Sequence, residues 1–204
     1  MRSVATDEAS APITAERSFT DHLDRLADAM TATRASCATA VALAAALVAD
    51  TLRRDGAVLA CGNGGSAAQA QHFVAELVGR MTADRLPLRA MSLTADSSTL
   101  TALGNDYGYD RVFARQVQAQ GRPADTLVAF SVSGTSPNVL IAIETARLAG
   151  LNTVLVTGQA PAPNDADVVI AVPSPVTAHV QEIHLAVTHA LSSAVERELF
   201  PELA

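Results

Sequence analysis

Two side chains that can transfer protons or bind a metal ion, His72 and Glu76, lie four residues apart in "CGNGGSAAQAQHFVAEL" (61–77). On a helix this spacing places both on one face. They could bind one divalent metal ion or act as an acid–base pair. The alternative is a structural histidine paired with its neighbouring carboxylate, the commoner role of an isolated pair. A functional role is favoured because a glycine-rich loop ends six residues before His72.

That loop, "GNGGS" (62–66), has the character of an anion-binding turn. Adjacent glycines let backbone amides turn toward an anion, and the helix that follows adds its partial positive charge. Ser66 could cap that helix or donate to a phosphate oxygen. A tight strand-to-helix turn is the alternative. The loop lacks the lysine of a nucleotide-binding P-loop, and Ala67 stands where a dinucleotide fingerprint has its third glycine, so a nucleotide is disfavoured.

A second polar loop, "SVSGTSPN" (131–138), follows a predicted strand. A helix cap and turn would need only one hydroxyl, whereas this loop carries three serines and a threonine around one glycine. Hydroxyls and free amides together suit a phosphate group. Neither loop supplies a cation to the phosphate. Both therefore favour a sugar phosphate held by neutral donors over a triphosphate with magnesium.

The last predicted helix carries Gln181, His184 and His189 in "QEIHLAVTHA". Gln181 and His189 lie roughly 80° apart around the helix and ~12 Å apart along it, while His184 points about 140° away from His189. For any one of these residues, a packed helix side chain is the strong alternative. Zinc–ligand bonds are about 2 Å long. Gln181 must accordingly lie at a bent helix start, or Gln181 and His189 serve different sites across a subunit interface.

The elements that must position these residues alternate along the chain. Short apolar runs predict five strands, at 57–61, 88–93, 125–132, 152–158 and 166–173. Helical patterns lie between and after them, at 66–79, 98–108, 111–120, 139–150 and 180–199. This alternation predicts an α/β fold with a parallel sheet covered by helices on both faces. Ligands of such sheets bind beyond the carboxyl ends of the strands, where both polar loops are expected.

Ahead of this α/β core (55–204), the pattern predicts a disordered tail at 1–15 and N-terminal helices at 16–54, so that 16–204 form a single domain. The stretch 41–52 is apolar almost all round, which predicts burial on more than one side, with a second subunit as a natural partner. The most apolar segment, 38–49, is shorter than the ~20 residues that span a bilayer. With no signal-peptide pattern at 1–18, a soluble cytoplasmic protein without a membrane partner is expected.

Composition narrows the function classes further. The 204 residues include 14 basic and 21 acidic side chains, giving a net charge of −7, which argues against nucleic acid as a partner. Nearly half of the residues are apolar, with few aromatics, so a core of Ala, Val and Leu is expected. The two cysteines, Cys37 and Cys61, form no CxxC motif and predict no disulfide.

Four blocks together resemble the sugar isomerase (SIS) domain superfamily: "CGNGGSAAQAQHFVAELVGR", "SLTADSSTLTALGNDYGYDRVF", "SVSGTSPNV" and "QEIHLAVTH". Within it the chain is most similar to bacterial phosphoheptose isomerases, over about 23–199. The resemblance implies a three-layer α/β sandwich with a five-stranded parallel sheet. It further implies a homotetramer formed through the N-terminal helices, with sites at subunit interfaces, and conversion of sedoheptulose 7-phosphate to D-glycero-D-manno-heptose 7-phosphate.

The resemblance also implies site residues. The catalytic pair falls on Glu76 and His189, and one Zn²⁺ per subunit would be bound by His72, Glu76, Gln181 and His189. Substrate-binding positions fall on Asn63, Gly64, Gly65, Ser66, Glu76, Asn105, Asp106, Ser131, Val132, Ser133, Ser136 and Gln181. Aldose–ketose isomerisation proceeds through an enediol. A carboxylate such as Glu76 can move the proton between carbons if burial raises its pKa, and His189 can exchange protons with the oxygens.

Two alternatives remain at this stage. Non-catalytic, replication-initiator-associating proteins of the superfamily are similar in "SAAQAQHF" and in the closing "LFP", but the presence of both Glu76 and His189 favours an enzyme. An isomerase of another sugar phosphate is the second alternative. Such an enzyme would act on a different ketose or an amino-sugar phosphate. Separately, the family usually has a longer glycine-rich loop, near the sugar end, where this chain has the short, proline-rich segment 159–165, which leaves a related seven-carbon substrate open.

Overall fold

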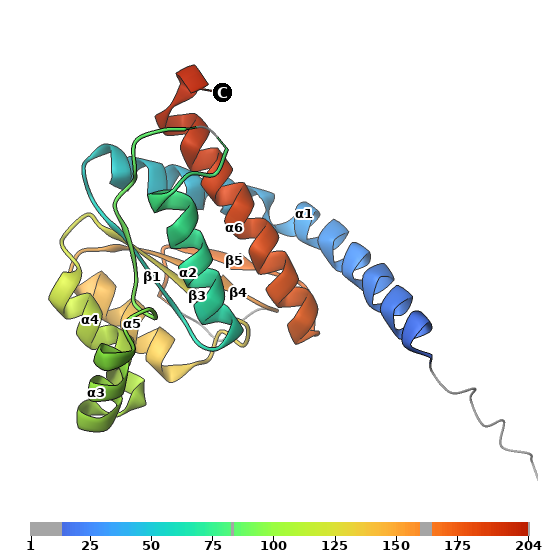
Figure 1. Ribbon diagram of the computed structural model, residues 1–204, viewed down its shortest axis with the longest axis horizontal. Helices are drawn as coiled ribbons and strands as arrows, with labels where there is room; N and C mark the ends of the chain where they lie inside the picture. Colours follow the sequence, from blue (N-terminus) through green and yellow to red (C-terminus); the bar gives the residue numbers. More distant parts are fainter. Residues whose placement is uncertain (1–13, 83, 160–164, 204) are drawn as a thin grey trace, which may run out of the picture.

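The computed structural model describes residues 14–82, 84–159 and 165–203, and shows a three-layer α/β sandwich (Figure 1). Its central sheet has five parallel strands in the order β2-β1-β3-β4-β5, which confirms the predicted fold class. The strands are β1 (Val58–Gly62), β2 (Ala90–Ser92), β3 (Thr126–Ser131), β4 (Asn152–Thr157) and β5 (Val168–Ala171). The helices are α1 (Ala15–Arg53), α2 (Gly65–Val78), α3 (Ser97–Tyr107), α4 (Val112–Gln120), α5 (Pro137–Leu148) and α6 (Thr177–Leu199), with short 3₁₀ turns at Tyr109–Arg111 and Pro201–Leu203.

The two faces of the sheet carry different helices. Alternate residues of a strand point to opposite faces, so Ala60 and Phe130 pack against α1, α2 and α6, whereas Leu59 and Leu127 pack against α3, α4 and α5. Both cores are built mainly from Ala, Val, Leu and Ile, as the composition predicts. Cys37 and Cys61 are buried, and neither is part of a disulfide. All five histidines lie on α1, α2 and α6, the helices of one face of the sheet.

Helix α1 is one continuous helix of 39 residues rather than several N-terminal helices. Thr14, at the edge of the predicted tail, accepts a hydrogen bond from the backbone of Arg17 and caps it, while residues 1–13 of that tail lie outside the described residues. Its second half packs into the core through Ala44, Ala45, Val48 and Ala49, and its first half projects from the sandwich (Figure 1).

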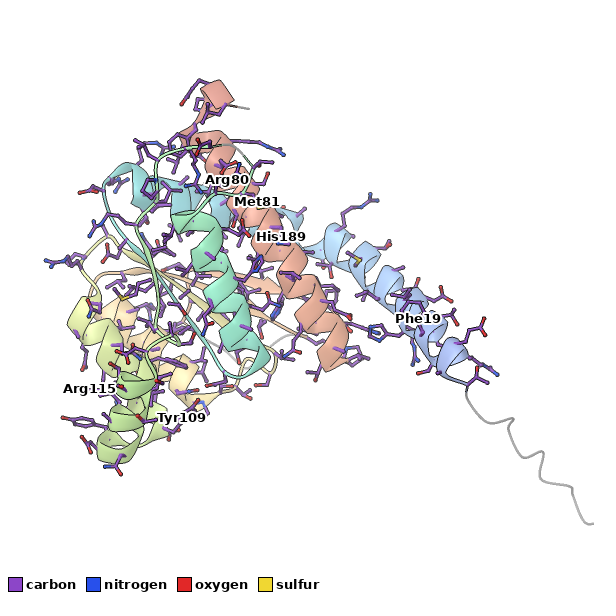
Figure 2. All side chains as sticks on the ribbon, in the orientation of Figure 1. Phe19, Arg80, Met81, Tyr109, Arg115 and His189 are labelled. Atoms are coloured by element: carbon purple, nitrogen blue, oxygen red, sulfur yellow. The ribbon has the colours of Figure 1, made fainter. Side chains whose placement is uncertain are left out.

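The first half of α1 exposes large apolar side chains. Phe19 is 62% exposed (Figure 2), and Leu23 and Met30 are exposed within about 40° of it around the helix axis. By length and composition, α1 is also apolar enough to cross a membrane, whereas the segment 38–49 alone was predicted to be too short to do so. The buried core helices of soluble proteins pass the same test. The exposed stripe is therefore a face of α1 that the single chain does not cover.

The sheet brings the two polar loops together. Strands β1 and β3 are neighbours, and Gly62 at the end of β1 is in register with Phe130 near the end of β3. The loops after these strands consequently leave the same edge of the sheet side by side. Helix α2 begins at Gly65 with Gly64 as its N-cap, so Ser66 is not the cap that the sequence allowed.

Candidate active site

A cavity of about 470 Å³ opens at the carboxyl ends of the strands, as expected for a parallel sheet. Seven of the substrate-binding positions inferred from the sequence line it together: Asn63, Ser66, Ser131, Val132, Ser133, Ser136 and Gln181. They come from the loop after β1 and the start of α2, from the end of β3 and the loop that follows it, and from the start of α6. The structure thus gathers residues that lie more than a hundred positions apart in the sequence.

The serine-rich loop is arranged around its hydroxyls. Ser136 stands at the N-cap of α5 but makes no capping bond through its side chain; instead it accepts a hydrogen bond of 3.2 Å from the hydroxyl of Ser131. The backbone N–H of Gly134 donates to Ser131 Oγ over 3.2 Å. Since the hydroxyls are not consumed in capping, they are available to a ligand at the N-terminus of α5, where the helix dipole favours an anion.

The glycine-rich loop meets its opposite wall through two glycines. Gly64 has φ of 55°, a left-handed backbone that favours glycine, and this turn aims the start of α2 at the cavity. A Cβ on Gly65 would collide with the side-chain amide of Gln181. Ser66 is buried and lines the cavity, and its hydroxyl forms no hydrogen bond with any described residue. Its position inside the first turn of α2 leaves that hydroxyl free for a ligand.

Asn63 is held at the mouth of this loop by two partners. Its side-chain amide donates to Asn138 Oδ1 over 2.8 Å, and Asn138 donates back to Asn63 Oδ1 over 2.8 Å. The hydroxyl of Tyr109 donates to the same Asn63 oxygen over 3.1 Å. Because this reciprocal pair joins the loop after β1 to the start of α5, it fixes the spacing of the two polar loops.

Farther along α2 and α6, two imidazoles and a carboxylate converge. His72 Nε2 lies 2.9 Å from His189 Nε2 and 3.2 Å from Glu76 Oε1. The ligand atoms of all three residues lie within 4.8 Å of one another. His72 and Glu76 share a face of α2, as their spacing predicts, and α6 (Figure 2 labels His189) supplies the third member. This arrangement can relay a proton or bind a small divalent ion.

Comparison with known proteins identifies the family of this chain. The SIS domain family model matches residues 19–158, more than half of the chain. The chain belongs to the SIS domain family. A phosphoheptose isomerase of Rhodospirillum rubrum is 52% identical over 165 residues, covering 80% of this chain and 88% of the relative.

Solved structures extend the likeness of this SIS domain to the whole fold. A phosphoheptose isomerase from Neisseria gonorrhoeae superposes with a TM-score of 0.84 at 39% identity, and one from Francisella tularensis with 0.86 at 34% identity. Each alignment covers 90% of this chain and 99% of the other. The five-stranded sheet and its helices are therefore the SIS fold of these enzymes.

A buried ion pair holds the two helices of the cluster together in this SIS domain. Arg85 donates from Nε to Glu196 Oε2 over 2.9 Å, and the two side chains are only 1% and 6% exposed. The Arg85 guanidinium also donates to the backbone oxygens of Glu76 and Leu77, which lie in the last turns of α2. Glu196 in turn accepts the backbone N–H groups of 81 and 82. Arg85 thus fixes the end of α2 against α6, close to Glu76.

Several inferred positions lie outside the cavity. Asn105 and Asp106 lie on α3, exposed and hydrogen-bonded to each other over 2.8 Å, and do not line it. Gly64, Gly65, His72, Glu76 and His189 are also absent from the lining. Gln181 meets Gly65 at the cavity, two turns of α6 before His189, so the single chain places Gln181 and the His72 cluster at different points along α6.

The cavity also includes residues that the sequence did not single out. Ser174, which is buried, contributes to it, and Phe130, Gln159, Pro175, Thr177 and Val180 complete the lining. A signal was present, because Gln159 and Ser174 follow the predicted strands β4 and β5 at their carboxyl ends. Of the proline-rich segment, residues 160–164 lie outside the described residues, while Asp165 pairs with Arg147 over 3.1 Å.

Proposed function

We propose that this SIS-domain chain is a phosphoheptose isomerase, which converts sedoheptulose 7-phosphate to D-glycero-D-manno-heptose 7-phosphate through an enediol. The observation that carries the proposal is the meeting of Glu76, His72 and His189 within one chain that also has the hydroxyl-lined cavity. A non-catalytic binding protein would need the cavity but not this cluster. Relatives named phosphoheptose isomerase, 45–52% identical, support the same substrate class.

The serine-rich loop is proposed as the phosphate site. Ser131, Ser133 and Ser136 offer hydroxyls, and the first turn of α5 offers backbone N–H groups to a dianion. Ser66, with its uncommitted hydroxyl, and Asn63 face the same cavity and would bind the adjoining sugar hydroxyls, together with the backbone of Gly64 and Gly65. Val132 is proposed to hold the phosphate together with the three serines. His72 lies six residues beyond Ser66, about 9 Å along α2. A seven-carbon chain is of comparable length.

Glu76 and His189 are proposed as the acid–base pair. The Glu76 carboxylate, only 19% exposed, removes a proton from C1 of the ketose and returns it to C2 of the enediol. His189 exchanges protons with the two oxygens as the carbonyl moves from C2 to C1. The contact between His72 and His189 fixes the orientation of the His189 ring.

The cluster also fits Zn²⁺. Bonds of about 2 Å in tetrahedral geometry place ligand atoms about 3.3 Å apart, close to the 2.9 Å and 3.2 Å that separate His72 Nε2 from its two neighbours. We propose His72, Glu76 and His189 as ligands. Because α6 is one continuous helix that separates Gln181 from His189 by about 12 Å, Gln181 is proposed as the fourth ligand of a site across a subunit interface. A bound ion would polarise the substrate carbonyl.

A homotetramer in the cytoplasm is proposed as the working form, with residues 16–204 of each subunit as one SIS domain. The exposed apolar stripe of Phe19, Leu23 and Met30 supports this, because a partner subunit would cover it. Asn105 and Asp106, which the chain's own cavity lacks, are proposed to bind sugar hydroxyls where two subunits meet.

The deciding experiment is turnover of a panel of ketose phosphates by purified protein supplied with zinc. We expect sedoheptulose 7-phosphate to be the preferred substrate. Turnover is measured by chromatographic separation of the ketose from its aldose product. Binding of the sugar phosphate by calorimetry without turnover of any panel member would refute an isomerase and leave a binding protein. Preference for another panel member would keep the chemistry and replace the substrate.

A further inference from the structure

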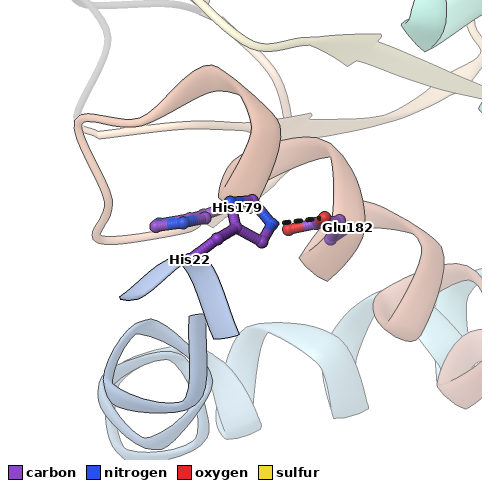
Figure 3. Close-up of side chains that lie close together, drawn as sticks. All are labelled: His22, His179 and Glu182. Atoms are coloured by element: carbon purple, nitrogen blue, oxygen red, sulfur yellow. Dashed lines mark hydrogen bonds and ion pairs between the residues drawn. The ribbon is translucent and has the colours of Figure 1, made fainter. Parts of the chain in front are cut away.

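A second cluster of two imidazoles and a carboxylate lies between α1 and the first turns of α6 (Figure 3). His22 comes from the projecting half of α1, whereas His179 and Glu182 are three residues apart on α6 and so share a face. The ligand atoms of the three lie within 4.8 Å of one another. None of them belongs to the cavity lining or to the His72 cluster.

The contacts within this cluster are uneven. His22 Nε2 is 2.8 Å from Glu182 Oε1, and the His22 ring lies edge-on to that of His179, with centroids 4.7 Å apart. His179 is 3% exposed, yet its ring nitrogens have no hydrogen-bond partner among the described residues. His179 therefore offers an imidazole nitrogen that lies within 4.8 Å of two other metal-ligand atoms and is not used in a hydrogen bond to any described residue.

We propose that His22, His179 and Glu182 bind a divalent transition-metal ion of the Zn²⁺ class. Two imidazoles and one carboxylate form a recognised zinc ligand set, with water completing the tetrahedron. The His22–Glu182 separation already suits a shared ion, and the His179 ligand atom, which lies within 4.8 Å of both, can reach the same ion by a side-chain movement. His22 and Glu182 are 34% and 43% exposed on their side chains, which gives the ion a path from solvent.

The ion would act as a structural clip. It joins the projecting half of α1 to the start of α6, whose neighbouring residues Thr177, Val180 and Gln181 line the cavity. The proposal does not rest on the isomerase activity, since neither its ligands nor its readouts involve the substrate.

The test counts metal ions bound by the full chain. After stripping with a chelator, protein is titrated with Zn²⁺ by calorimetry and with Co²⁺ by visible absorption, in the wild type and in a His72→Ala/His189→Ala background. We expect the background variant to retain one equivalent per chain, and the addition of His179→Ala to remove it. An unchanged number of bound ions after His179→Ala would overturn the proposal.

Because His179 is buried, its replacement could disturb folding, so Glu182→Gln provides an exposed alternative. Glu198→Gln is its matched control: Glu198 also lies on α6 and also pairs with α1, through Arg53 over 2.9 Å, but has no histidine beside it. We expect affinity at this site to fall at least tenfold in Glu182→Gln and to stay unchanged in Glu198→Gln. Equal affinities in both variants would contradict the site.

A structural readout separates a clip from adventitious binding. Arg17 and Arg25 flank His22 on the projecting half of α1 and are exposed. Zn²⁺ should slow tryptic cleavage at these arginines in the wild type and not in Glu182→Gln under identical conditions. Equal protection in both proteins would show that the ion does not hold α1 to α6.

Discussion

The two histidine–glutamate clusters use the same residue types but differ in how they are fixed. In the cluster of His72, Glu76 and His189, all three members are half-buried, and the nearby Arg85–Glu196 pair fixes their two helices. In the cluster of His22, His179 and Glu182, burial ranges from a fully covered imidazole to an exposed carboxylate, and one supporting helix projects from the sandwich. Burial and helix anchoring, rather than residue type, thus separate a site suited to catalysis from one suited to holding two elements together.

The largest effect is expected where the comparison predicts chemistry. Glu76→Gln and His189→Ala should each lower kcat by about 10²–10⁴-fold, since each removes one partner of the proton transfer. The measurement is steady-state turnover of sedoheptulose 7-phosphate. Glu198→Gln, an exposed carboxylate on α6 outside both clusters, serves as control and should retain wild-type kcat. Near-normal kcat in both cluster variants would place the chemistry elsewhere.

The second prediction removes the anchor of the first cluster. Glu196→Gln leaves the 1%-exposed Arg85 side chain without its counter-charge and should lower the free energy of unfolding by about 3–5 kcal/mol. Urea unfolding measures this, with Glu198→Gln as the exposed counterpart, expected to cost less than about 1 kcal/mol. Similar unfolding midpoints for the two variants would show that the buried pair does not anchor α2 to α6.

The third prediction concerns the cavity. Along α6, the cavity lies nearer to the cluster of His22, His179 and Glu182 than to the cluster of His72, Glu76 and His189. Ser131→Ala and Ser136→Ala should each raise KM for a sugar phosphate by about tenfold or more, the equivalent of about 1.5–3 kcal/mol for a lost hydrogen bond to a charged group. Ser36→Ala, an exposed serine on α1, is the matched control. A decrease in kcat at constant KM would instead assign these hydroxyls to the chemical step.

His184 provides a third histidine on α6 that belongs to neither cluster. It is fully buried and packs against Phe130. Burial lowers the pKa of His184, and the nearby backbone of Thr157 acts in the opposite direction with a smaller effect. Neither ring nitrogen of His184 forms a hydrogen bond of regular geometry.

Because the pKa of His184 is lower in the folded than in the unfolded chain, the unfolded chain takes up the imidazole proton at a higher pH. The free energy of unfolding of the wild type should therefore fall as the pH drops below about 6.5, by up to about 1.4 kcal/mol per pH unit. His184→Leu should reduce that slope in urea unfolding between neutral and acidic pH. An identical slope in the variant would mean that His184 does not contribute to acid sensitivity.

The smallest effect is expected at the second cluster without metal. The His22–Glu182 pair is about one-third to two-fifths exposed, so Glu182→Gln should change stability by less than about 1 kcal/mol in the presence of chelator. Adding Zn²⁺ should raise the melting temperature of the wild type more than that of the variant. A large loss in chelator would indicate that the pair stabilises the fold without an ion.

The sequence by itself determined the local features of this protein. Alternating apolar runs specified five parallel strands with helices between them, because strand and helix periods differ. The spacing of His72 and Glu76 placed both on one face of a helix. The two polar loops were expected at strand ends, and the structure places them beside one cavity. Element ends were less accurate, as α2 and α6 begin one and three residues before their predicted starts.

Tertiary structure alone decided which distant residues meet. His72 reaches His189 across 117 positions because α2 and α6 pack on the same face of the sheet. Gln181 meets Gly65 rather than His189, since one straight helix separates residues eight apart by about 12 Å. No local pattern marks His22 as a partner of His179 and Glu182. That contact exists only because the long α1 crosses the start of α6, and packing between elements, unlike periodicity, depends on the whole fold.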